Sequence, residues 1–128
     1  MAWTSIIENV QLDDVRADRK TRKSVEMYGI SQKAIYFRGE YLPISEIERV
    51  CVFPSVYRPH HSNGRGLPVF KLRIDYGQEK PLVLIFEKER NANRAAVLIY
   101  GRNRNVRIEQ YINPLTGGTT KDIPPYLW

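Results

Sequence analysis

The sequence predicts a mainly β fold, either a β-barrel or an orthogonal sandwich, with one C-terminal α-helix that caps it. Short runs rich in β-branched and aromatic residues recur between residues 24 and 86, and glycines and prolines separate them. No helical pattern lies between successive runs, which is typical of α+β and small-barrel folds rather than of parallel α/β sheets. After residue 86 the apolar spacing changes from two residues to about 3.6. This change indicates a single late helix.

The first strands are predicted over residues 24–29, 34–38 and 41–44. Gly39 predicts a tight turn before the third strand, because glycine adopts positive φ at no steric cost. Pro43 indicates that this strand ends there or lies at an edge.

A turn-like step over residues 45–48 leads into the next strand, at residues 49–53. Residues 54–68 contain three prolines and two glycines and are interpreted as a break. The clearest strand follows at residues 70–76, where apolar and charged residues alternate strictly, and residues 77–80 form a hairpin connection. The continuous apolar run at residues 81–86 predicts a strand covered on both faces.

The helix is predicted over residues 87–100. Its apolar face is formed by Ala92, Ala95, Ala96 and Ile99, which follow the i, i+3, i+4, i+7 spacing. Glutamates lie near its start, where the helix dipole favours negative charge. Gly101 is predicted to form its C-terminal cap.

A chain of 128 residues corresponds to one domain. We divide it into a polar basic leader at residues 1–23, a folded core at residues 24–101 and a C-terminal extension at residues 102–128. Whether the leader pairs with the core stays open. The extension ends in apolar and aromatic residues that we expect to dock on the core or on a partner subunit: Ile123, Tyr126, Leu127 and Trp128.

The net charge of +6 permits contact with nucleic acid, an anionic membrane or an acidic protein. The positive charge is densest at residues 16–23 and 102–107. No aromatic-basic signature of an RNA-binding sheet is present, so nucleic acid is not an expected partner. No apolar run approaches the roughly 18 residues of a membrane span, and the start lacks a secretory pattern, so we expect a cytoplasmic protein.

Cysteine and histidine are residue types that could serve catalysis or bind a metal, but their positions in the sequence favour neither function. Cys51 lies in an apolar strand, where cysteine is commonly a small buried hydrophobe. His60 and His61 are adjacent, so on an extended chain they point to opposite sides and chelate poorly. We therefore expect no catalytic residue, no metal and no cofactor.

The loop at residues 54–68 combines cations, aromatics and glycines, which suits it to gripping an anion through backbone N–H groups and an arginine fork. Its candidate anion-binding residues are Arg58, His60 and Arg65.

Residues 27–38 resemble the opening hairpin of bacterial pleckstrin-homology-like and GRAM-like domains, and residues 42–50 resemble the third strand of those families with its I-x-x-I step. The helix at residues 87–100 is similar to the one that closes one end of their barrel. This resemblance covers residues 24–101 and implies a pleckstrin-homology-like superfold, which serves lipid binders, peptide binders and oligomerisation modules. Lys33 and Arg38 match the cations that lipid-binding members place across this hairpin, whereas Glu40 departs from that pattern.

Taken together, these observations predict a non-catalytic interaction module that binds a protein partner or a copy of itself by adding an extended segment to a strand edge or groove. The alternative is peripheral binding to anionic, phosphoinositide-like lipid through Arg58, Arg65 and the cluster at residues 16–23. An enzyme of unidentified type is the third reading.

Overall fold

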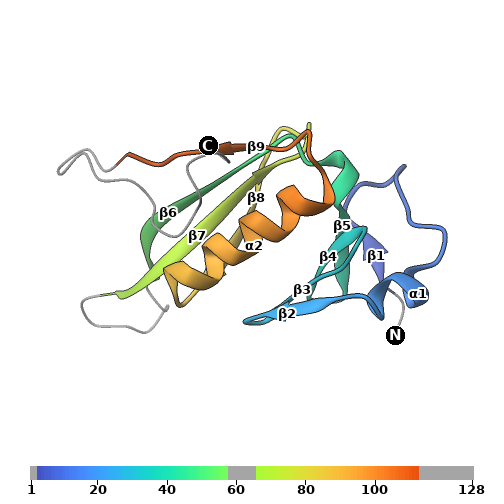
Figure 1. The fold of residues 1–128 in the computed structure, drawn as a ribbon, viewed down its shortest axis with the longest axis horizontal. Helices are drawn as coiled ribbons and strands as arrows, with labels where there is room; N and C mark the ends of the chain where they lie inside the picture. The colour runs from blue at the N-terminus through green and yellow to red at the C-terminus, as the bar shows by residue number, and fades with distance from the viewer. Residues whose placement is uncertain (1–2, 58–65, 113–128) are drawn as a thin grey trace.

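The computed structural model describes residues 3–57 and 66–112, which form a five-stranded sheet, a four-stranded sheet and one long helix (Figure 1). The predicted class, mainly β with one late helix, is confirmed. Within the described residues neither sheet closes on itself. Of the two predicted arrangements, a barrel or an orthogonal sandwich, the barrel is therefore wrong, and the strands are divided between two sheets.

The N-terminal sheet has the strand order β1-β5-β4-β3-β2, and all its pairs are antiparallel except β1 with β5. Its strands are β1 (Thr4–Ser5), β2 (Lys23–Val25), β3 (Tyr28–Ile30), β4 (Ala34–Phe37) and β5 (Glu40–Pro43). Arg38 and Gly39 both have positive φ, 47° and 78°. They form the two-residue hairpin turn that was predicted at Gly39, a conformation that matches the twist of the flanking strands.

The single strand predicted over residues 24–29 is wrong. Glu26 has a φ of 54°, and the chain reverses at Glu26 and Met27 so that Val25 pairs with Tyr28. Two short strands, β2 and β3, result. Positive φ is uncommon for a residue with a side chain, and tertiary contacts of Glu26, described below, account for it here.

Residues 3–23 belong to the fold of this sheet. They supply β1 and the short helix α1 (Val15–Arg19), which Asp14 caps by accepting a hydrogen bond from the Ala17 N–H at 3.0 Å. Leu12 and Val15 pack with Trp3 against the outward side chains of β4 and β5. The leader therefore covers the face of the N-terminal sheet that is turned away from the main core.

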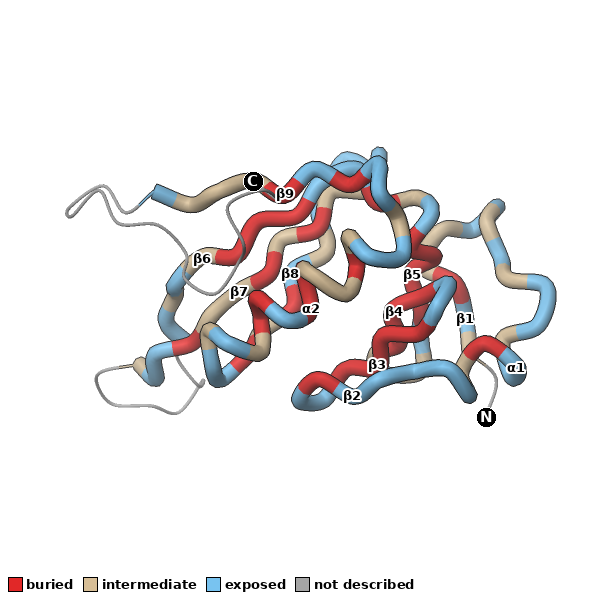
Figure 2. Tube along the Cα trace, viewed as in Figure 1, coloured by how far each residue is buried: buried red, intermediate tan, exposed pale blue. Residues whose placement is uncertain are grey.

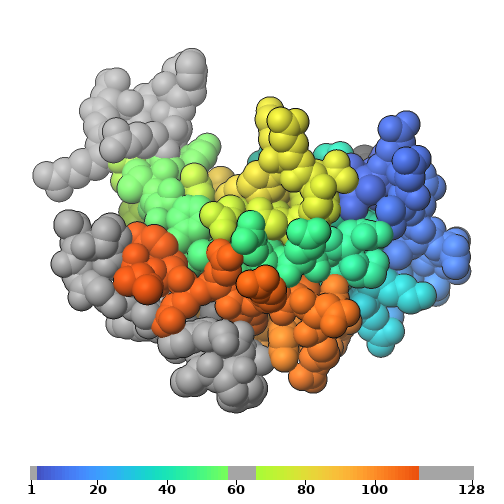
Figure 3. Space-filling model, turned by 90° about the horizontal axis from the view of Figure 1, so that it is seen from above, coloured from blue at the N-terminus to red at the C-terminus, as the bar shows by residue number. Residues whose placement is uncertain are grey.

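The C-terminal sheet has the order β8-β7-β6-β9 and follows a short 3-10 turn, Ile44–Glu46. Its strands are β6 (Arg49–Tyr57), β7 (Leu67–Asp75), β8 (Leu82–Phe86) and β9 (Arg107–Glu109). Figure 3 shows β9 running beside β6, with which it pairs in parallel. The strand predicted at residues 70–76 is confirmed, and so is the hairpin connection after it, where Gly77 has a φ of 78°.

Two predictions about this sheet are wrong. The strand predicted to end before Pro54 does not end there, because β6 continues through Pro54 to Tyr57. Among the described residues β9 pairs only with Arg49–Cys51, so beyond Cys51 one side of β6 is an edge, where proline is tolerated. The run at residues 81–86 is not covered on both faces: Leu84 and Phe86 are buried, whereas Val83 is 40% exposed. In this sheet β8 is an edge strand with one face on the core.

Helix α2 (Glu89–Arg102) confirms the predicted late helix, and Ala92, Ala95, Ala96 and Ile99 are all fully buried. The predicted cap at Gly101 is wrong. Gly101 lies inside the helix, which ends at Arg102. The cap is Asn103, whose backbone N–H donates to Ile99 O at 2.9 Å. The Asn103 side chain also donates to Ile44 O at 2.9 Å, so a contact with the 3-10 turn fixes the end of the helix.

The two sheets and α2 share one hydrophobic core. Figure 2 shows buried residues where α2 faces β6, β7 and β8, and along β3, β4 and β5. The largest fully buried side chains in this core include Ile30, Leu42, Leu72 and Phe86. No described helix has both the length and the apolar character needed to cross a membrane.

Candidate functional site

Two side chains fasten the turn between β2 and β3 to strand β8 and to the start of α2. The Tyr28 hydroxyl accepts a hydrogen bond from the Ile85 N–H at 2.9 Å and donates to the Ile85 carbonyl at 3.1 Å. Glu26 accepts hydrogen bonds from the Glu87 N–H at 2.7 Å and from the Lys88 N–H at 3.2 Å. Because these groups lead into the N-terminus of α2, the carboxylate also complements the helix dipole.

Glu26 makes a third contact with the helix, since it accepts a hydrogen bond from Asn91 Nδ2 at 2.9 Å. The carboxylate thus caps a helix more than sixty residues away in the sequence. This use explains why a glutamate occupies a position with positive φ in a two-residue turn.

Beside this junction lies a cleft of about 760 Å³, which we call the inter-sheet groove. Its walls come from the β2–β3 turn and from the ends of β6, β7 and β8. It is lined by Glu26, Met27, Tyr28, Arg38, Tyr57, Leu67, Pro68, Val69, Ile85 and Glu87. A volume of this size lies within the range of roughly 300–1,000 Å³ that is typical of ligand sites.

The mouth of the groove exposes apolar surface. Met27 is 70% exposed, Leu67 59% and Tyr57 47%. Single exposed hydrophobic residues are ordinary on protein surfaces, but several around one cleft mark an interaction site. Arg38, Glu26 and Glu87 add charge to this lining, so the groove presents an apolar floor with a few polar groups.

A smaller hollow of about 160 Å³ lies on the other side of the same turn, between β2, β3 and the leader. We call it the arginine pocket; the residues that define it are Trp3, Arg19, Arg22, Tyr36 and Arg38. The Arg19 guanidinium lies over the Trp3 ring, 4.4 Å from its centroid, and 5.9 Å from the centroid of Tyr36. Trp3 in turn meets Tyr36 edge to face, with 5.3 Å between ring centroids.

Asp18 joins α1 to the N-terminal sheet beneath this pocket. Its carboxylate accepts hydrogen bonds from the Ser31 hydroxyl, from the Tyr36 hydroxyl at 2.7 Å and from the Lys33 N–H at 3.1 Å. Burial, together with the bond to the Asp18 carboxylate, raises the pKa of Tyr36 well above its ordinary value. With its carboxylate satisfied in this way, Asp18 serves as a structural anchor for the leader.

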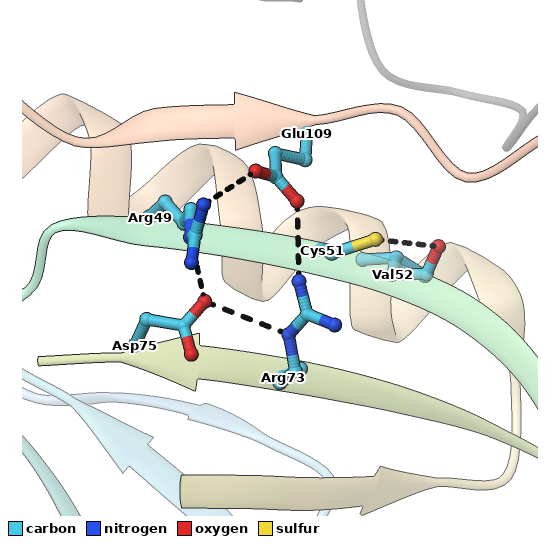
Figure 4. Close-up of polar contacts among 6 residues, drawn as sticks. All are labelled: Arg49, Cys51, Val52, Arg73, Asp75 and Glu109. Atoms are coloured by element: carbon cyan, nitrogen blue, oxygen red, sulfur yellow. Dashed lines mark hydrogen bonds and ion pairs between the residues drawn. The ribbon is translucent and has the colours of Figure 1, made fainter. Parts of the chain in front are cut away.

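On the outer face of the C-terminal sheet, four side chains from β6, β7 and β9 form a ring of ion pairs (Figure 4). Arg49 contacts Asp75 at 2.8 Å and Glu109 at 3.1 Å. Arg73 contacts Glu109 at 3.1 Å and lies 3.5 Å from Asp75. All four are partly exposed, and exposed ion pairs contribute little to stability individually.

Cys51 lies beside this ring and is buried, which confirms the prediction that it is a small buried hydrophobe. Burial raises the pKa of its thiol, an effect that the nearby Arg73 charge opposes. A raised pKa keeps the sulfur in its unreactive thiol form. Within residues 3–57 and 66–112, no three His, Cys, Asp or Glu side chains are grouped so that they could hold a metal ion.

The structure places two of the predicted anion-binding residues at opposite ends of β4. Lys33 precedes this strand and Arg38 follows it, so about 16 Å of extended chain separates them. They do not converge on one site. Arg38 instead lies with Arg19 and Arg22, two members of the basic cluster at residues 16–23. The other candidates lie outside the described residues: Arg58, His60, Arg65, Ile123, Tyr126, Leu127 and Trp128.

Sequence reasoning missed Glu26, Met27, Tyr28 and Trp3 as parts of a site. Met27 gave a usable signal of a surface site, because an apolar side chain at a chain reversal is exposed rather than buried in the core. Glu26 gave none, since its partners are distant in the sequence.

Comparison with known proteins assigns no relative. No protein-family model matches the chain, and neither a curated protein nor a solved structure is significantly similar to it.

Proposed function

We propose that this chain is a non-catalytic interaction module, with a pleckstrin-homology-like arrangement of strands and late helix, that binds an extended apolar segment in the inter-sheet groove. The segment is residues 123–128 of the chain itself, from the same molecule or from a second copy. The observation that carries this proposal is the groove of about 760 Å³ with Met27, Tyr57 and Leu67 exposed around it.

Two modes of addition were expected, at a strand edge or in a groove, and at the edge strand β8 the contacts favour the groove. On the edge strand β8, the Tyr28 hydroxyl already occupies both the N–H and the carbonyl of Ile85. Pro81, just before β8, has no N–H to offer. A segment adding to this edge would have to displace Tyr28, whereas the groove beside it requires no such displacement.

The composition of residues 123–128 suits an apolar groove. Ile123, Tyr126, Leu127 and Trp128 offer large apolar side chains, and Pro124 with Pro125 restrains the backbone to an extended form. Restraint of this kind lowers the conformational entropy lost on binding. Among the groove's charged groups, Glu26 is occupied in capping α2, which supports a binding role over a catalytic one.

The test is a binding titration with a labelled peptide that covers residues 119–128. The peptide is titrated into a full-length chain that carries Tyr126→Ser, Leu127→Ser and Trp128→Ser. These three substitutions stop the chain's own tail from competing with the peptide. Met27→Gln and Leu67→Gln together should weaken binding at least about ten-fold, because each side chain contributes apolar area to the contact. Both residues are largely exposed, so these changes should leave the fold intact. Val83→Gln, at an exposed site outside the groove lining, is the matched control. Equal affinity in all three proteins would reject the groove as the binding surface.

One observation favours a second candidate function, peripheral binding to anionic lipid. Met27 is 70% exposed at the tip of the β2–β3 hairpin, near the exposed Arg22 and Arg38. An apolar tip flanked by cations can enter a membrane interface, and each cation near the surface contributes about 1 kcal/mol. Co-sedimentation with phosphatidylserine vesicles at physiological salt, lost on Met27→Gln, would support this function. Binding seen only at low salt would be the generic response of a +6 protein and would count against it.

A further inference from the structure

The arginine pocket and the inter-sheet groove meet at the β2–β3 turn. Four residues line both hollows: Glu26, Met27, Tyr28 and Arg38. A segment that lies in the groove can therefore place the next residue in the arginine pocket by crossing the turn beside Met27. The two hollows form one continuous surface, apolar on one side and cationic on the other.

The three arginines of this pocket have no carboxylate partner among the described residues, in which every ion pair involves Arg49 or Arg73. Arg19 Nε is buried without a hydrogen-bond partner in the same part of the chain. Among the described residues the Arg22 side chain makes one hydrogen bond, from Nη1 to the Arg19 carbonyl at 2.8 Å, which leaves further donors on its guanidinium. Glu26, which also lines the pocket, has its carboxylate engaged by α2. The pocket thus carries an excess of positive charge and of unused N–H donors.

Contacts that exist without a ligand already hold two of these arginines in place. Arg19 is stacked on Trp3, and the bond from Arg22 to the Arg19 carbonyl ties the two together. The Arg22 side chain also passes closely over Gly29: a Cβ at that position would lie 3.0 Å from Arg22 Cδ. Because the cations are ordered in advance, an anion that binds them incurs a smaller entropic cost.

The size of the pocket limits what can enter. Its volume of about 160 Å³ corresponds to roughly five water molecules at about 30 Å³ each, which suits a side-chain carboxylate with some water. The ligand chemistry that fits the combined surface is therefore an acidic residue followed directly by apolar residues. In the chain's own tail, Asp122 immediately precedes Ile123 and is the only acidic residue of residues 113–128.

We infer that the arginine pocket is an anion subsite that receives the carboxylate of Asp122 while residues 123–128 lie in the groove. This inference rests on the proposed function and adds the charged group that sets the register and direction of the bound segment. Nine residues separate Ile112, the last described residue, from Asp122. Fully extended, they allow a span of roughly 33 Å, compared with a radius of gyration near 14 Å for a domain of this length. This span exceeds that radius, so the tail can extend well away from Ile112.

The experiment compares two labelled peptides of residues 119–128, one with the native Asp122 and one with Asp122→Asn. Each is titrated by fluorescence anisotropy into the full-length chain with Tyr126→Ser, Leu127→Ser and Trp128→Ser. The native peptide should bind about ten-fold more tightly than the Asn peptide, because the charge-assisted hydrogen bonds to arginine are lost in the latter. Arg22→Gln, which lies in the arginine pocket and outside the groove lining, should weaken binding of the native peptide and leave binding of the Asn peptide unchanged. Arg94→Gln, an exposed change on α2, should affect the binding of neither peptide.

Each alternative outcome is decisive. Equal affinity of the two peptides would overturn the anion subsite and leave the groove proposal standing. A weaker Asn peptide with no effect of the pocket arginines would place the Asp122 partner elsewhere and would also overturn the inference. Failure of both peptides to bind would reject the proposed function itself. Phosphatidylserine vesicles that bind the native chain at physiological salt, but not Arg22→Gln or Arg38→Gln, would assign the pocket to a lipid headgroup instead.

Discussion

Asp18 shows how one buried carboxylate can attach a polar leader to a β-sheet. It is 7% exposed and accepts hydrogen bonds from Ser31, Lys33 and Tyr36, so α1 is fixed to the start and middle of β4. Arg19, the next residue, is thereby directed toward Trp3 and the arginine pocket. The position of one of the pocket's cations therefore depends on a buried carboxylate beneath the pocket.

The bond between Asp18 and Tyr36 predicts a specific dependence of stability on alkaline pH. The pKa of Tyr36 is raised in the folded protein, while in the unfolded chain it returns to its ordinary value of 10.0. Above pH 10 the unfolded state therefore binds fewer protons than the folded state, and stability falls as pH rises, by up to about 1.4 kcal/mol per pH unit from this group. Below pH 10 this contribution is fully present.

Urea unfolding of the native chain and of Tyr36→Phe between pH 8 and 11 measures this effect. The native chain should be the more stable at pH 8, and the difference between the two should shrink above pH 10. The two proteins share every other titratable group, so the comparison isolates Tyr36. Parallel stability curves across the whole range would contradict the account of Tyr36.

Cys51 provides a second prediction at the level of a single residue. Because the thiol is buried and its pKa is raised, little thiolate is available for alkylation. Iodoacetamide at pH 8 should modify the folded protein far more slowly than the protein unfolded in urea, as followed by mass spectrometry. Equal rates in the two states would show that Cys51 is accessible and reactive.

Among the elements, the β2–β3 hairpin joins the two sheets and also walls both hollows. Tyr28 fastens it to β8, and Glu26 fastens it to the start of α2. The stability of the hairpin and the shape of the candidate site are therefore coupled. Loss of either fastening should loosen the turn at which the groove and the pocket meet.

Glu26→Ala tests this coupling. The change removes the acceptor of three hydrogen bonds at the start of α2, and loss of a helix cap costs about 1–2 kcal/mol of unfolding free energy. Glu79→Ala, in the exposed connection between β7 and β8, is the matched control and should have little effect. Chemical denaturation of both variants and of the native chain measures the change in the free energy of unfolding. Equal stabilities for Glu26→Ala and the native chain would show that the hairpin is held by other contacts.

The elements also show how far the sequence could predict the structure. The β4–β5 turn at Gly39, strand β7 and helix α2 follow from local spacing and backbone preference, so they were predictable. The break of β2 from β3 was not, because Glu26 adopts positive φ in a place where its partners are the backbone and side chain of a helix start. The site was likewise predictable only in part. Arg19 and Arg22 lay in a visible basic cluster, but their convergence with Trp3, Met27 and Arg38 depends on tertiary contacts.

At the scale of the whole molecule, both sheets and α2 share one core, and the groove opens where the sheets meet. A segment bound there contacts residues from both sheets at once. Its binding should therefore stabilise the folded state as a whole, because a ligand that binds only the native state raises its free energy of unfolding. The central claim is that residues 122–128 are that segment.

The most direct measurement compares the native chain with a chain that lacks residues 122–128, by thermal melting and by sedimentation velocity over a range of concentrations. We expect the deletion to lower the melting temperature by a few degrees if the tail binds its own molecule, or to convert a dimer to a monomer if it binds a second copy. Met27→Gln with Leu67→Gln should reproduce that effect in the full chain and add little to it in the deleted one. A deletion that changes neither the melting temperature nor the oligomeric state would contradict the account.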